Sequence, residues 1–524
     1  MTLRTNTALC AALALAACAA PASPPASAPA PSAAPSAGLT PAQAVATITP
    51  EDVYARVEFL ASDAMRGRDL QPGAGRIAAN YVVSQHRQLG LLPGGENGTY
   101  FQWWPFPLRR LDAANARLEV TGTAGATRLT LGQDYFGAGG TVQPIQGAAL
   151  VYAGRGADAV FAEGSMRGRV AIVAIPGSAT RDWRLERNRL RNGAQRAGAS
   201  AIVYVLDAAW TADTIARWAE TAQNPARSLG DQVAYPQFLL TRDAARRVFQ
   251  AAGLSLDEQL RAGEGLTQPV ALPGVAVNAA LPVETLDAGR APNVVAILPG
   301  SDPALRDEYV VLSAHMDHIG VGRAVNGDSI NNGADDDASG TSGLLEVAQA
   351  MAQLGVRPRR SVVFLHVSGE EKGLLGSQWY SDHPTLPLSQ IVANVNVDMI
   401  ARNAADSVVV IGKNYSTLGA VTNRLNDEHR ELNLTLADDI WPEQRFFFRS
   451  DHFNFARKEV PSIFFFSGVH EDYHRPSDEV EKIDADKAAR ISRMVFYLVY
   501  EIANDPQRPQ WDPAGLAEVR QMTR

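Results

Sequence analysis

Cysteine is almost absent from this chain. Only Cys10 and Cys18 occur among its 524 residues, and both lie near the N-terminus. Residues 1–18 contain one Arg, then a short apolar run (ALCAALALAA), then LAAC. This pattern predicts a cleaved secretory signal, because the run is too short to anchor a protein across a bilayer. The mature, exported protein would contain no disulfide, so its hydrophobic core or a bound metal has to stabilise it.

Residues 15–18 (LAAC) also resemble the bacterial lipoprotein signal, in which the cysteine is lipidated and becomes the new N-terminus. An ordinary signal cut at a nearby small residue is the alternative. We expect membrane attachment through lipidated Cys18, with Ala19 favouring the outer membrane, and otherwise a periplasmic or secreted protein. Residues 19–38 contain only Ala, Pro, Ser and Gly. That composition is typical of an extended linker, because it cannot form a hydrophobic core.

An excess of positive charge is absent as well, since 48 Lys and Arg residues stand against 56 Asp and Glu residues. The formal net charge is -8, and the sequence contains no basic run. Both properties argue against nucleic-acid binding. With 46% hydrophobic and 20% charged residues, the chain is typical of a globular protein, and its length allows more than one domain.

The first part of the folded chain, residues 39–141, contains two helical patterns at 49–70 and 76–93 and an aromatic strand at 99–111. Residues 142–274 differ, because short apolar strands (GAALVYAG, GRVAIVAIPG and ASAIVYVL) alternate with glycines and helical segments. This second region has no histidine and no clustered carboxylates. We therefore assign it no chemistry.

Residues 275–505 combine strands with longer helices. Apolar, β-branched runs of strand length occur at 293–300, 308–315, 361–371, 391–399, 407–414 and 461–468. Runs that are apolar at nearly every position predict strands buried on both faces. We therefore predict an α/β fold, with a mostly parallel mixed sheet flanked by helices. Residues 506–524 are expected to form a loosely held tail.

Candidate metal ligands cluster where these strands end, which is where open α/β sheets gather their ligands. Four of the runs lead to a histidine or a carboxylate, and the stretch GADDDASG adds three aspartates at the head of a helix. These residues are His315 with Asp317, Glu370 with Glu371, Asp398, His470 with His474, and Asp335, Asp336 and Asp337. Aspartate is also favoured at helix N-termini without any metal. A purely structural origin, however, would scatter such residue types over exposed positions.

The number of ligands indicates two metal ions. Two histidines and three carboxylates, one of them bridging, give each ion three protein ligands and leave one position open for water, as in a catalytic zinc site. Nitrogen and oxygen ligands without thiolates suit Zn²⁺. Of the adjacent pair, Glu371 is the expected ligand and Glu370 the general base. Asp317 is placed to accept the second ring N–H of His315.

The same residues lie in motifs that resemble the co-catalytic two-zinc aminopeptidase family, which includes glutamate carboxypeptidase II-like peptidases. The motifs are AHMDHIG, NNGADDDASGTSGLLEVAQAM, RPRRSVVFLHVSGEEKGLLGSQWY, VNVDMI, RSDHFNF and DYHRPSD. The resemblance covers approximately residues 50–486 and implies the zinc exopeptidase fold. Residues 142–274 are similar to the β-rich protease-associated domain that many relatives carry as an insertion. Residues 39–141 and 275–505 would then form one peptidase domain.

The resemblance also implies a role for each ligand. It makes His315 and Asp398 ligands of one Zn²⁺, and Glu371 and His474 ligands of the other. Asp336 bridges the two ions. These assignments agree with the base and ligand roles that chemistry gives to the glutamate pair.

Neighbouring residues receive smaller roles from the resemblance. The residue beside the last histidine helps relatives to bind the oxyanion, which makes Tyr473 the expected donor. The Asp336–Asp337 peptide bond is expected to be cis, as in the family. Residues 450–452 (Ser-Asp-His) take positions that order the site. His366 lies inside a predicted strand and is expected to pack in the core.

The resulting prediction is an exported zinc aminopeptidase that acts on peptides. A carboxypeptidase or dipeptidase on the same site is the alternative. A free α-carboxylate would need cations, and Arg323, Arg402, Arg445, Arg449 and Arg475 lie near the motifs. A non-catalytic, receptor-like member is a more distant alternative, since some relatives have lost their metals. The preferred side chain and the oligomeric state do not follow from the sequence.

Overall fold

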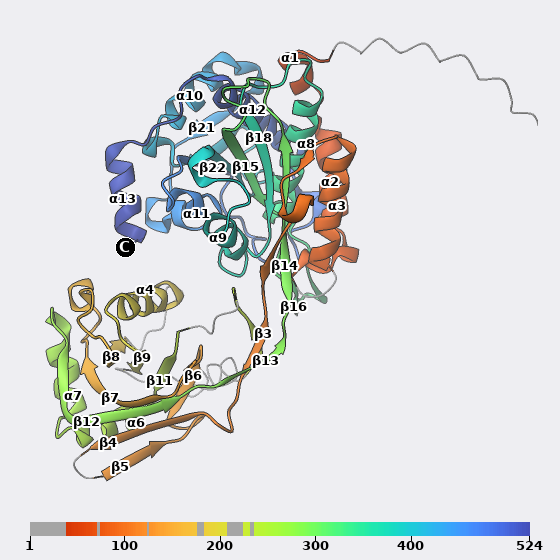
Figure 1. Cartoon of the computed structure of the whole chain (residues 1–524). Coiled ribbons are helices and arrows are strands. Elements are labelled where there is room, and N and C mark those ends of the chain that lie inside the picture. Colours follow the sequence, from red (N-terminus) through yellow and green to blue (C-terminus); the bar gives the residue numbers. More distant parts are fainter. Residues whose placement is uncertain are drawn as a thin grey trace, which may run out of the picture. The chain divides into compact units, whose positions relative to one another are not determined.

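The computed structural model describes residues 38–70, 74–122, 125–175, 183–206, 224–230 and 235–523. The predicted signal (1–18) and the linker up to residue 37 lie outside them, so both stay predictions. Residues Leu39–Arg524 belong to one unit, whose helices and strands are labelled in Figure 1. Within the described part, no helix combines the length and the apolarity needed to cross a membrane.

A mixed sheet, called here the central sheet, carries the candidate ligands. Within the described residues nine strands form it, in the order β1-β14-β18-β15-β19-β22-β20-β21, with β2 pairing β14. β18, β15, β19 and β22 pair in parallel, whereas β14 and β20 are antiparallel to β18 and β22. The strands are β1 (Leu92–Pro93), β2 (Phe101–Pro105), β14 (Arg290–Leu298), β15 (Tyr309–His315), β18 (Ser361–Val367), β19 (Ile391–Val397), β20 (Ser407–Ile411), β21 (Thr435–Ala437) and β22 (Ser462–Phe466). The six predicted strands are all present, which confirms the α/β class.

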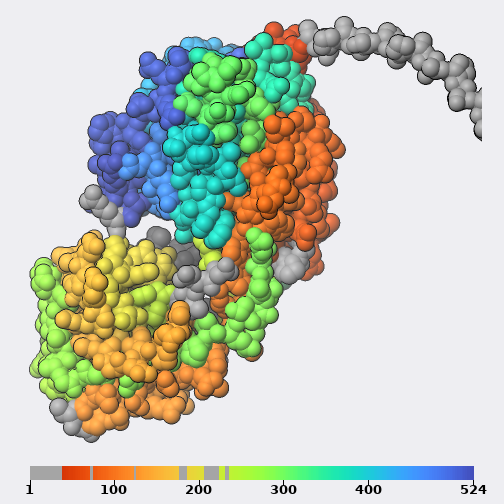
Figure 2. All heavy atoms as spheres, in the orientation of Figure 1, coloured from red at the N-terminus to blue at the C-terminus, as the bar shows by residue number. Residues whose placement is uncertain are grey.

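Helices cover both faces of the central sheet. They are α1 (Pro41–Val45), α2 (Pro50–Leu60), α3 (Ala74–Gln88), α8 (Gly340–Ala352), α9 (Leu375–Asp382), α10 (Leu418–Glu428), α11 (His452–Ala456), α12 (Ala485–Asn504) and α13 (Pro513–Thr523). Side chains of α2, α3, α8 and α12 share one buried cluster with Leu312 and Ala314 of β15, whereas α9 and α11 pack with Val311 in another. In the space-filling view, α2 and α3 (orange) form part of the surface (Figure 2).

The N-terminal helices begin at threonine caps. Thr40 and Thr49 each accept the N–H group three residues further on, and each helix starts with a proline. Such caps satisfy donors that the first helical turn leaves free. The helical pattern predicted at 49–70 yields α2 and then a short 3₁₀ segment, Asp63–Arg68, whose last residue is fully buried.

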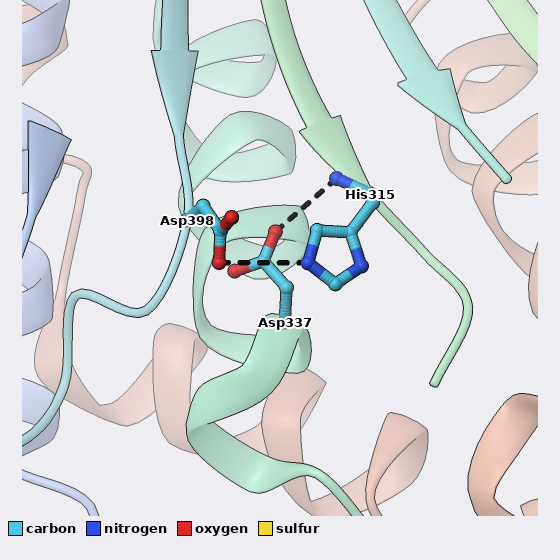
Figure 3. A group of neighbouring side chains, drawn as sticks. All are labelled: His315, Asp337 and Asp398. Carbon is cyan, nitrogen blue, oxygen red and sulfur yellow. Dashed lines mark hydrogen bonds and ion pairs between the residues drawn. The ribbon is translucent and has the colours of Figure 1, made fainter. Parts of the chain in front are cut away.

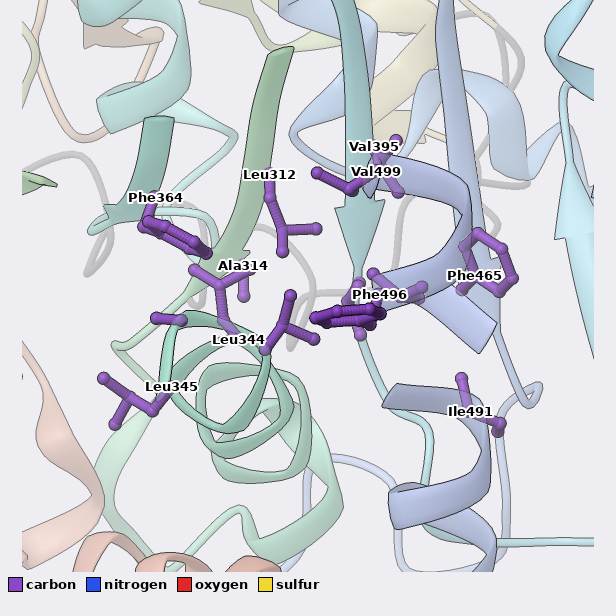
Figure 4. Packing of buried hydrophobic residues seen from close by; sticks show 14 of the residues in the cluster. Leu312, Ala314, Leu344, Leu345, Phe364, Val395, Phe465, Ile491, Phe496 and Val499 are labelled. Carbon is purple, nitrogen blue, oxygen red and sulfur yellow. The ribbon is translucent and has the colours of Figure 1, made fainter. Parts of the chain in front are cut away.

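The core positions the candidate site through α8. Leu312 and Ala314 of β15, Leu344 of α8 and Phe496 of α12 pack together and are fully buried (Figure 4). Burying one such Leu or Phe side chain stabilises a fold by about 1.5–3 kcal/mol. This packing holds the N-terminal end of α8, and the loop before it, against the strand that ends at His315.

A second sheet, called here the inserted sheet, interrupts the chain between β2 and β14. Within the described residues eight strands form it, in the order β5-β4-β12-β7-β8-β9-β11-β6. They are β4 (Arg117–Gly122), β5 (Gly125–Leu129), β6 (Tyr135–Ala138), β7 (Ile145–Tyr152), β8 (Val170–Ile175), β9 (Ala201–Leu206), β11 (Gln237–Leu240) and β12 (Val270–Ala280), with helices α4 (Trp183–Arg196), α6 (Arg242–Ala251) and α7 (Leu256–Ala262). Two small sheets combine β3 (Leu108–Leu111), β10 (Ala226–Arg227) and β13 (Val283–Asp287), and β16 (Gly320–Val325) with β17 (Asp328–Asn331).

The expected boundaries of the insertion, residues 142–274, are too narrow. β4, β5 and β6 precede residue 142 but pair within the inserted sheet, and β12 continues to Ala280. β12 closes this sheet by pairing antiparallel with both β4 and β7. Strand patterns show where strands form, but they do not show which strands pair across a long stretch of chain.

The expectation of a loosely held tail at 506–524 is wrong for most of that segment. α13 spans Pro513–Thr523 and buries Val519. Arg520 donates to the Glu459 carboxylate with Nε and Nη2, both at 2.8 Å. Trp511 Nε1 donates to the Glu459 carbonyl at 2.7 Å. The segment therefore docks through one buried side chain and several hydrogen bonds.

Candidate metal centre

The candidate ligands meet at one edge of the central sheet. His315 ends β15, the Glu370–Glu371 pair comes after β18, Asp398 comes directly after β19, and His474 lies in the loop after β22. Because these four strands are parallel, their carboxyl ends share that edge. Figure 3 shows His315 and Asp398 at the ends of their strands, facing the start of α8.

The metal loop, residues 333–340, brings its aspartates to this edge. It forms an irregular helical turn, Ala334–Ser339, that continues into α8. The Asp336–Asp337 peptide bond is cis, as expected. Asp335, Asp336 and Asp337 are all buried, yet each contacts different partners.

Asp336 lies between two histidines. Its Oδ1 is 3.3 Å from His315 Nε2, and its Oδ2 is 3.2 Å from His474 Nε2. Each histidine also faces a second carboxylate, since His315 Nε2 is 3.5 Å from Asp398 Oδ1 and His474 Nε2 is 3.0 Å from Glu371 Oε2. The structure thus brings together all five predicted ligands, in two halves that share Asp336.

The electrostatics of this cluster favour a cation. Burial disfavours the charged form of His474, but its contacts with Asp336 and Glu371 outweigh burial and raise the pKa of the imidazole to about 10. For His315, too, the neighbouring carboxylates outweigh burial and raise the pKa well above its usual value. Buried carboxylates that attract protons to both imidazoles offer the same attraction to metal ions. A mixed set of imidazole nitrogens and carboxylate oxygens fits Zn²⁺.

Asp337 is a close neighbour with a different function. One ligand atom each of His315, Asp337 and Asp398 lie within 4.8 Å of one another. Both oxygens of Asp337 are already occupied, however. Oδ1 accepts the N–H groups of Gly340 at 2.9 Å and Met399 at 3.0 Å, and Oδ2 accepts the N–H of His315 at 3.2 Å (Figure 3). Asp337 therefore ties the metal loop to β15 and to the segment after β19.

Asp335 and Asp478 join the metal loop to the loop that carries His474. The carboxylate of Asp478 accepts the N–H groups of Asp335 and Asp336, each at 3.2 Å. Asp335 Oδ2 lies 3.3 Å from His470 Nε2. His470 thus faces Asp335, while His474 occupies the position predicted for the ligand.

Glu370 lies beside the cluster with an open carboxylate. Its Oε2 is 4.0 Å from His315 Nε2, and its side chain is 13% exposed. Among the described residues, none donates a hydrogen bond to this carboxylate. Burial raises the pKa of Glu370 well above its usual value, although His315 counteracts this effect. The geometry and the basicity suit a group that accepts a proton.

Asp317 differs from its prediction in one detail. Its main-chain carbonyl, and not its carboxylate, lies within hydrogen-bonding distance of His315 Nδ1, at 3.1 Å. The nearest carboxylate oxygen is 3.9 Å from that nitrogen. The carboxylate accepts the N–H of Glu370 at 3.3 Å instead. Asp317 therefore orients the imidazole through its backbone and the Glu370 turn through its side chain.

Two of the other predicted neighbours, Ser450 and Tyr473, each contact a predicted ligand. Ser450 Oγ donates to Asp398 Oδ2 at 2.7 Å. Tyr473 stacks on His474 with ring centroids 3.9 Å apart. Burial raises the pKa of the Tyr473 hydroxyl, which stays protonated and can donate. His366 is fully buried and pairs with His86, Nε2 to Nε2, at 3.0 Å.

Sequence reasoning missed His318. This fully buried imidazole has its Nδ1 2.7 Å from Glu371 Oε1 and 3.7 Å from Asp336 Oδ2. His318, Asp336 and Glu371 also form a second group of potential ligand atoms within 4.8 Å of one another. The signal was visible in the motif HMDH, in which the second histidine lies three residues after the first.

Arg68 is the second group that was missed. Its guanidinium is fully buried and donates to main-chain carbonyls only. The acceptors are Leu60 at 2.9 Å, Met316 at 3.1 Å, Asn332 at 2.5 Å, Gly333 at 2.8 Å and Asp336 at 3.3 Å. One side chain from the N-terminal segment thus binds the start of the metal loop and the carbonyl of Asp336 itself. No sequence pattern signals this role, because Arg68 is far from every motif.

Fold and site together define an α/β protein with a cluster of histidines and carboxylates at the ends of its parallel strands. Residues 293–499 match the model of peptidase family M28. This match agrees with the resemblance of the chain's motifs to the co-catalytic two-zinc aminopeptidase family.

Curated relatives are similar to a part of the chain. A probable leucine aminopeptidase of Trichophyton verrucosum is 27% identical over 226 residues, which cover 40% of this chain and 58% of that protein. Aminopeptidase YwaD of Bacillus subtilis is 27% identical over 215 residues, covering 39% of this chain and 43% of that one. The chain therefore spans about half the length of these relatives. The solved aminopeptidase from Aneurinibacillus sp. strain AM-1 has the same fold, with a TM-score of 0.50 and 19% identity over 90% of this chain and 98% of that one.

Proposed function

We propose that the protein is an exported zinc-dependent aminopeptidase that releases N-terminal residues from peptides. The observation that carries the proposal is Asp336, whose two oxygens face two different histidines, each with a further carboxylate beside it. A carboxylate between two such halves is the arrangement that two ions sharing one ligand require. The names of the relatives support the same activity.

In this proposal His315, Asp398 and Asp336 hold one Zn²⁺, and His474, Glu371 and Asp336 hold the other. When bound, the ions would supply Lewis-acid activation of the hydrolytic water and of the peptide carbonyl. The protein's own groups do the rest.

Proton transfer falls to Glu370. Its open carboxylate accepts the proton of the attacking water and passes it to the leaving amine. The hydroxyl of Tyr473 donates a hydrogen bond to the oxyanion that develops on the substrate. The carbonyl of Asp317 holds the tautomer of His315, which leaves Nε2 free as the ligand atom.

The arginines near the motifs favour an aminopeptidase over a carboxypeptidase. Arg402 Nη2 already pairs with Asp472 Oδ2 at 2.8 Å. Arg445 and Arg449 lie over the rings of Phe448 and Phe446, at 5.1 and 4.6 Å from the centroids. Three of the five candidate receptors for an α-carboxylate are thus engaged elsewhere. The carboxylates of the site, in contrast, attract a free α-amino group.

A set of related peptides tests this choice. Purified protein, with Zn²⁺ or with chelator, is given one peptide with free termini, its N-acetylated form and its C-amidated form. We expect zinc-dependent cleavage of the free and the C-amidated peptides, and none of the N-acetylated one. Cleavage of the free and the N-acetylated peptides, but not of the C-amidated one, would favour the carboxypeptidase. No cleavage by a protein that retains no zinc would favour the receptor-like alternative.

The location is a separate proposal, supported by the N-terminal sequence alone. Lipidation of Cys18 would anchor the protein in the cell envelope, and the linker would hold the folded part away from the membrane surface. Cys18→Ala tests this. The wild type should incorporate radiolabelled palmitate and sediment with membranes, whereas the variant should do neither. Equal labelling of both proteins would refute the anchor.

A further inference from the structure

A chain of hydrogen bonds runs through the central sheet to Asp398. Asn394 Nδ2 donates to Ser313 Oγ at 2.9 Å, and Ser313 Oγ donates to Asn396 Oδ1 at 2.7 Å. Asn396 Nδ2 donates to Ser450 Oγ at 2.9 Å, and Ser450 Oγ donates to Asp398 Oδ2 at 2.7 Å. All five residues are buried. Four polar side chains thus lead from inside the sheet to a predicted metal ligand.

Strand geometry places these residues in one row. Asn394, Asn396 and Asp398 alternate along β19 and its end, so they share one face. Ser313 is the register partner of Asn396 on the neighbouring parallel strand β15. A buried polar group without a partner costs about 1–3 kcal/mol, so polar residues at these positions require a compensating network.

The direction of the chain is fixed at both ends. A carboxylate only accepts hydrogen bonds, so Ser450 donates to Asp398 and in turn receives from the Asn396 amide. At the other end, Asn394 Nδ2 also lies 3.4 Å from the Val311 carbonyl, which again only accepts. Asn394 Oδ1 has no partner among the described residues, so the chain begins there. Every donor points toward Asp398, and the dipoles of such a chain reinforce one another.

This polarity has a consequence for the metal centre. The last hydrogen bond of this network occupies Asp398 Oδ2. The other oxygen, Oδ1, faces His315 Nε2 at 3.5 Å. We propose that Ser313 and Asn396 are positioning residues that, through Ser450, hold Asp398 as a one-oxygen ligand in the His315 half of the site. The proposal rests on the zinc site of the proposed function. Loss of outer groups of this kind typically lowers metal affinity about 10–100-fold.

A double-mutant cycle tests the chain with Zn²⁺ as the probe. Competition titrations against a chelator yield two zinc dissociation constants for the full-length protein. They are carried out on the wild type, on Ser313→Ala, on Ser450→Ala and on the double variant. We expect Ser313→Ala to weaken one constant about 10-fold and to leave the other unchanged. In the Ser450→Ala background the same substitution should have no further effect, because the link to Asp398 is already broken.

Ser492→Ala is the matched control. Ser492 is a buried serine of α12 whose hydroxyl donates to the Ala488 carbonyl at 2.8 Å and takes no part in the hydrogen bonds that lead to Asp398. Its loss should lower the melting temperature about as much as Ser313→Ala does, with both zinc constants unchanged. Zinc constants in Ser313→Ala equal to those of the control would overturn the proposal, and so would a Ser313 effect that persists without Ser450. A wild type that binds no zinc would overturn the proposed function instead.

Discussion

The central and inserted sheets share an architecture but differ in the residue types at the ends of their strands. Each contains four neighbouring parallel strands, β18-β15-β19-β22 and β7-β8-β9-β11. In the central sheet the parallel strands lead to histidines and carboxylates. In the inserted sheet β11 leads to Thr241, which caps α6. Parallel strand ends therefore provide a place for a site, whereas the side chains at those ends decide whether one exists.

The distribution of titratable residues shows the same division. All nine histidines lie outside residues 112–287, which contain the whole inserted sheet. The groups of potential metal ligands found among the described residues lie at the central sheet only. Removal of the metal, replacement of the general base and acidification should therefore affect the central sheet and leave the inserted sheet unchanged.

Zinc removal should have the largest effect. Chelation should abolish peptidase activity and lower the stability of the central sheet, because a ligand at 100 times its dissociation constant stabilises the folded state by about 2.7 kcal/mol. Hydrogen exchange measured by mass spectrometry, with and without chelator, checks both sheets at once. Peptides from β15 and β19 should lose protection, whereas those from β7 and β12 should not. Equal losses in both sheets would show that zinc does not stabilise the central sheet selectively.

Replacement of the base should come next. Glu370→Gln keeps the shape of the side chain but cannot accept the proton, so kcat should fall about 10²–10⁴-fold. Zinc content should stay at the wild-type value. Glu459→Gln, which weakens the ion pair with Arg520 of α13, is the control and should retain full activity. Near-normal turnover in Glu370→Gln would remove the residue from the mechanism.

Arg68 should matter for metal binding more than for the stability of the fold. Arg68→Met leaves carbonyls of the metal loop unpaired, and zinc affinity should fall about 10–100-fold. Arg360 is a matched control, since it is equally buried and bonds the Ile502, Asp505 and Pro506 carbonyls and the Glu308 carboxylate. Arg360→Met should destabilise the protein without changing zinc affinity. The same zinc affinity in both variants would contradict this role.

The smallest effect should appear on acidification of the zinc-free protein. Burial lowers the pKa of His86 to about 3, and burial likewise lowers that of His366. Between pH 6.5 and about 3, the unfolded state therefore binds protons that the folded state does not bind. As the pH is lowered through this range, the free energy of unfolding decreases by up to about 1.4 kcal/mol per pH unit for each group. Urea unfolding of His86→Leu/His366→Leu at pH 7.5, 6 and 5 should show a shallower slope than the wild type. An unchanged slope would place the acid sensitivity elsewhere.

The sequence predicted those parts of the molecule that depend on local pattern. The strands at 308–315 and 391–399 were recognisable because both faces are buried, and the ligand positions were recognisable because metal chemistry requires those residue types at strand ends. Asp336 could be separated from Asp335 and Asp337 only by resemblance. The structure supplies the physical reason, since the backbone N–H groups that bind Asp337 leave only Asp336 between the two histidines.

The features that escaped prediction depend on contacts between distant segments. Arg68 donates to the Gly333 carbonyl of the metal loop, which lies 265 residues away in the chain. The pairing of β4 with β12 also joins distant segments. Because of it, the insertion begins before residue 142 and ends after residue 274, the boundaries expected from the sequence. Asn394 and Asn396 had a visible signal, the alternation of polar residues along an otherwise apolar strand. That signal indicates a buried network, but not its destination.

The two glycines that bound the metal loop restrict how this protein can be altered. A Cβ on Gly333 would lie 2.2 Å from the Asp336 carbonyl oxygen, and φ at Gly333 is +60°. A Cβ on Gly340 would lie 2.3 Å from Asp337 Oδ1 and 2.6 Å from the Val397 carbonyl oxygen. A library of variants that randomises residues 333–340 should therefore return both glycines from any selection for activity. New substrate preferences are therefore expected from loop residues outside this segment that neither bind the metal ions nor contact their ligands.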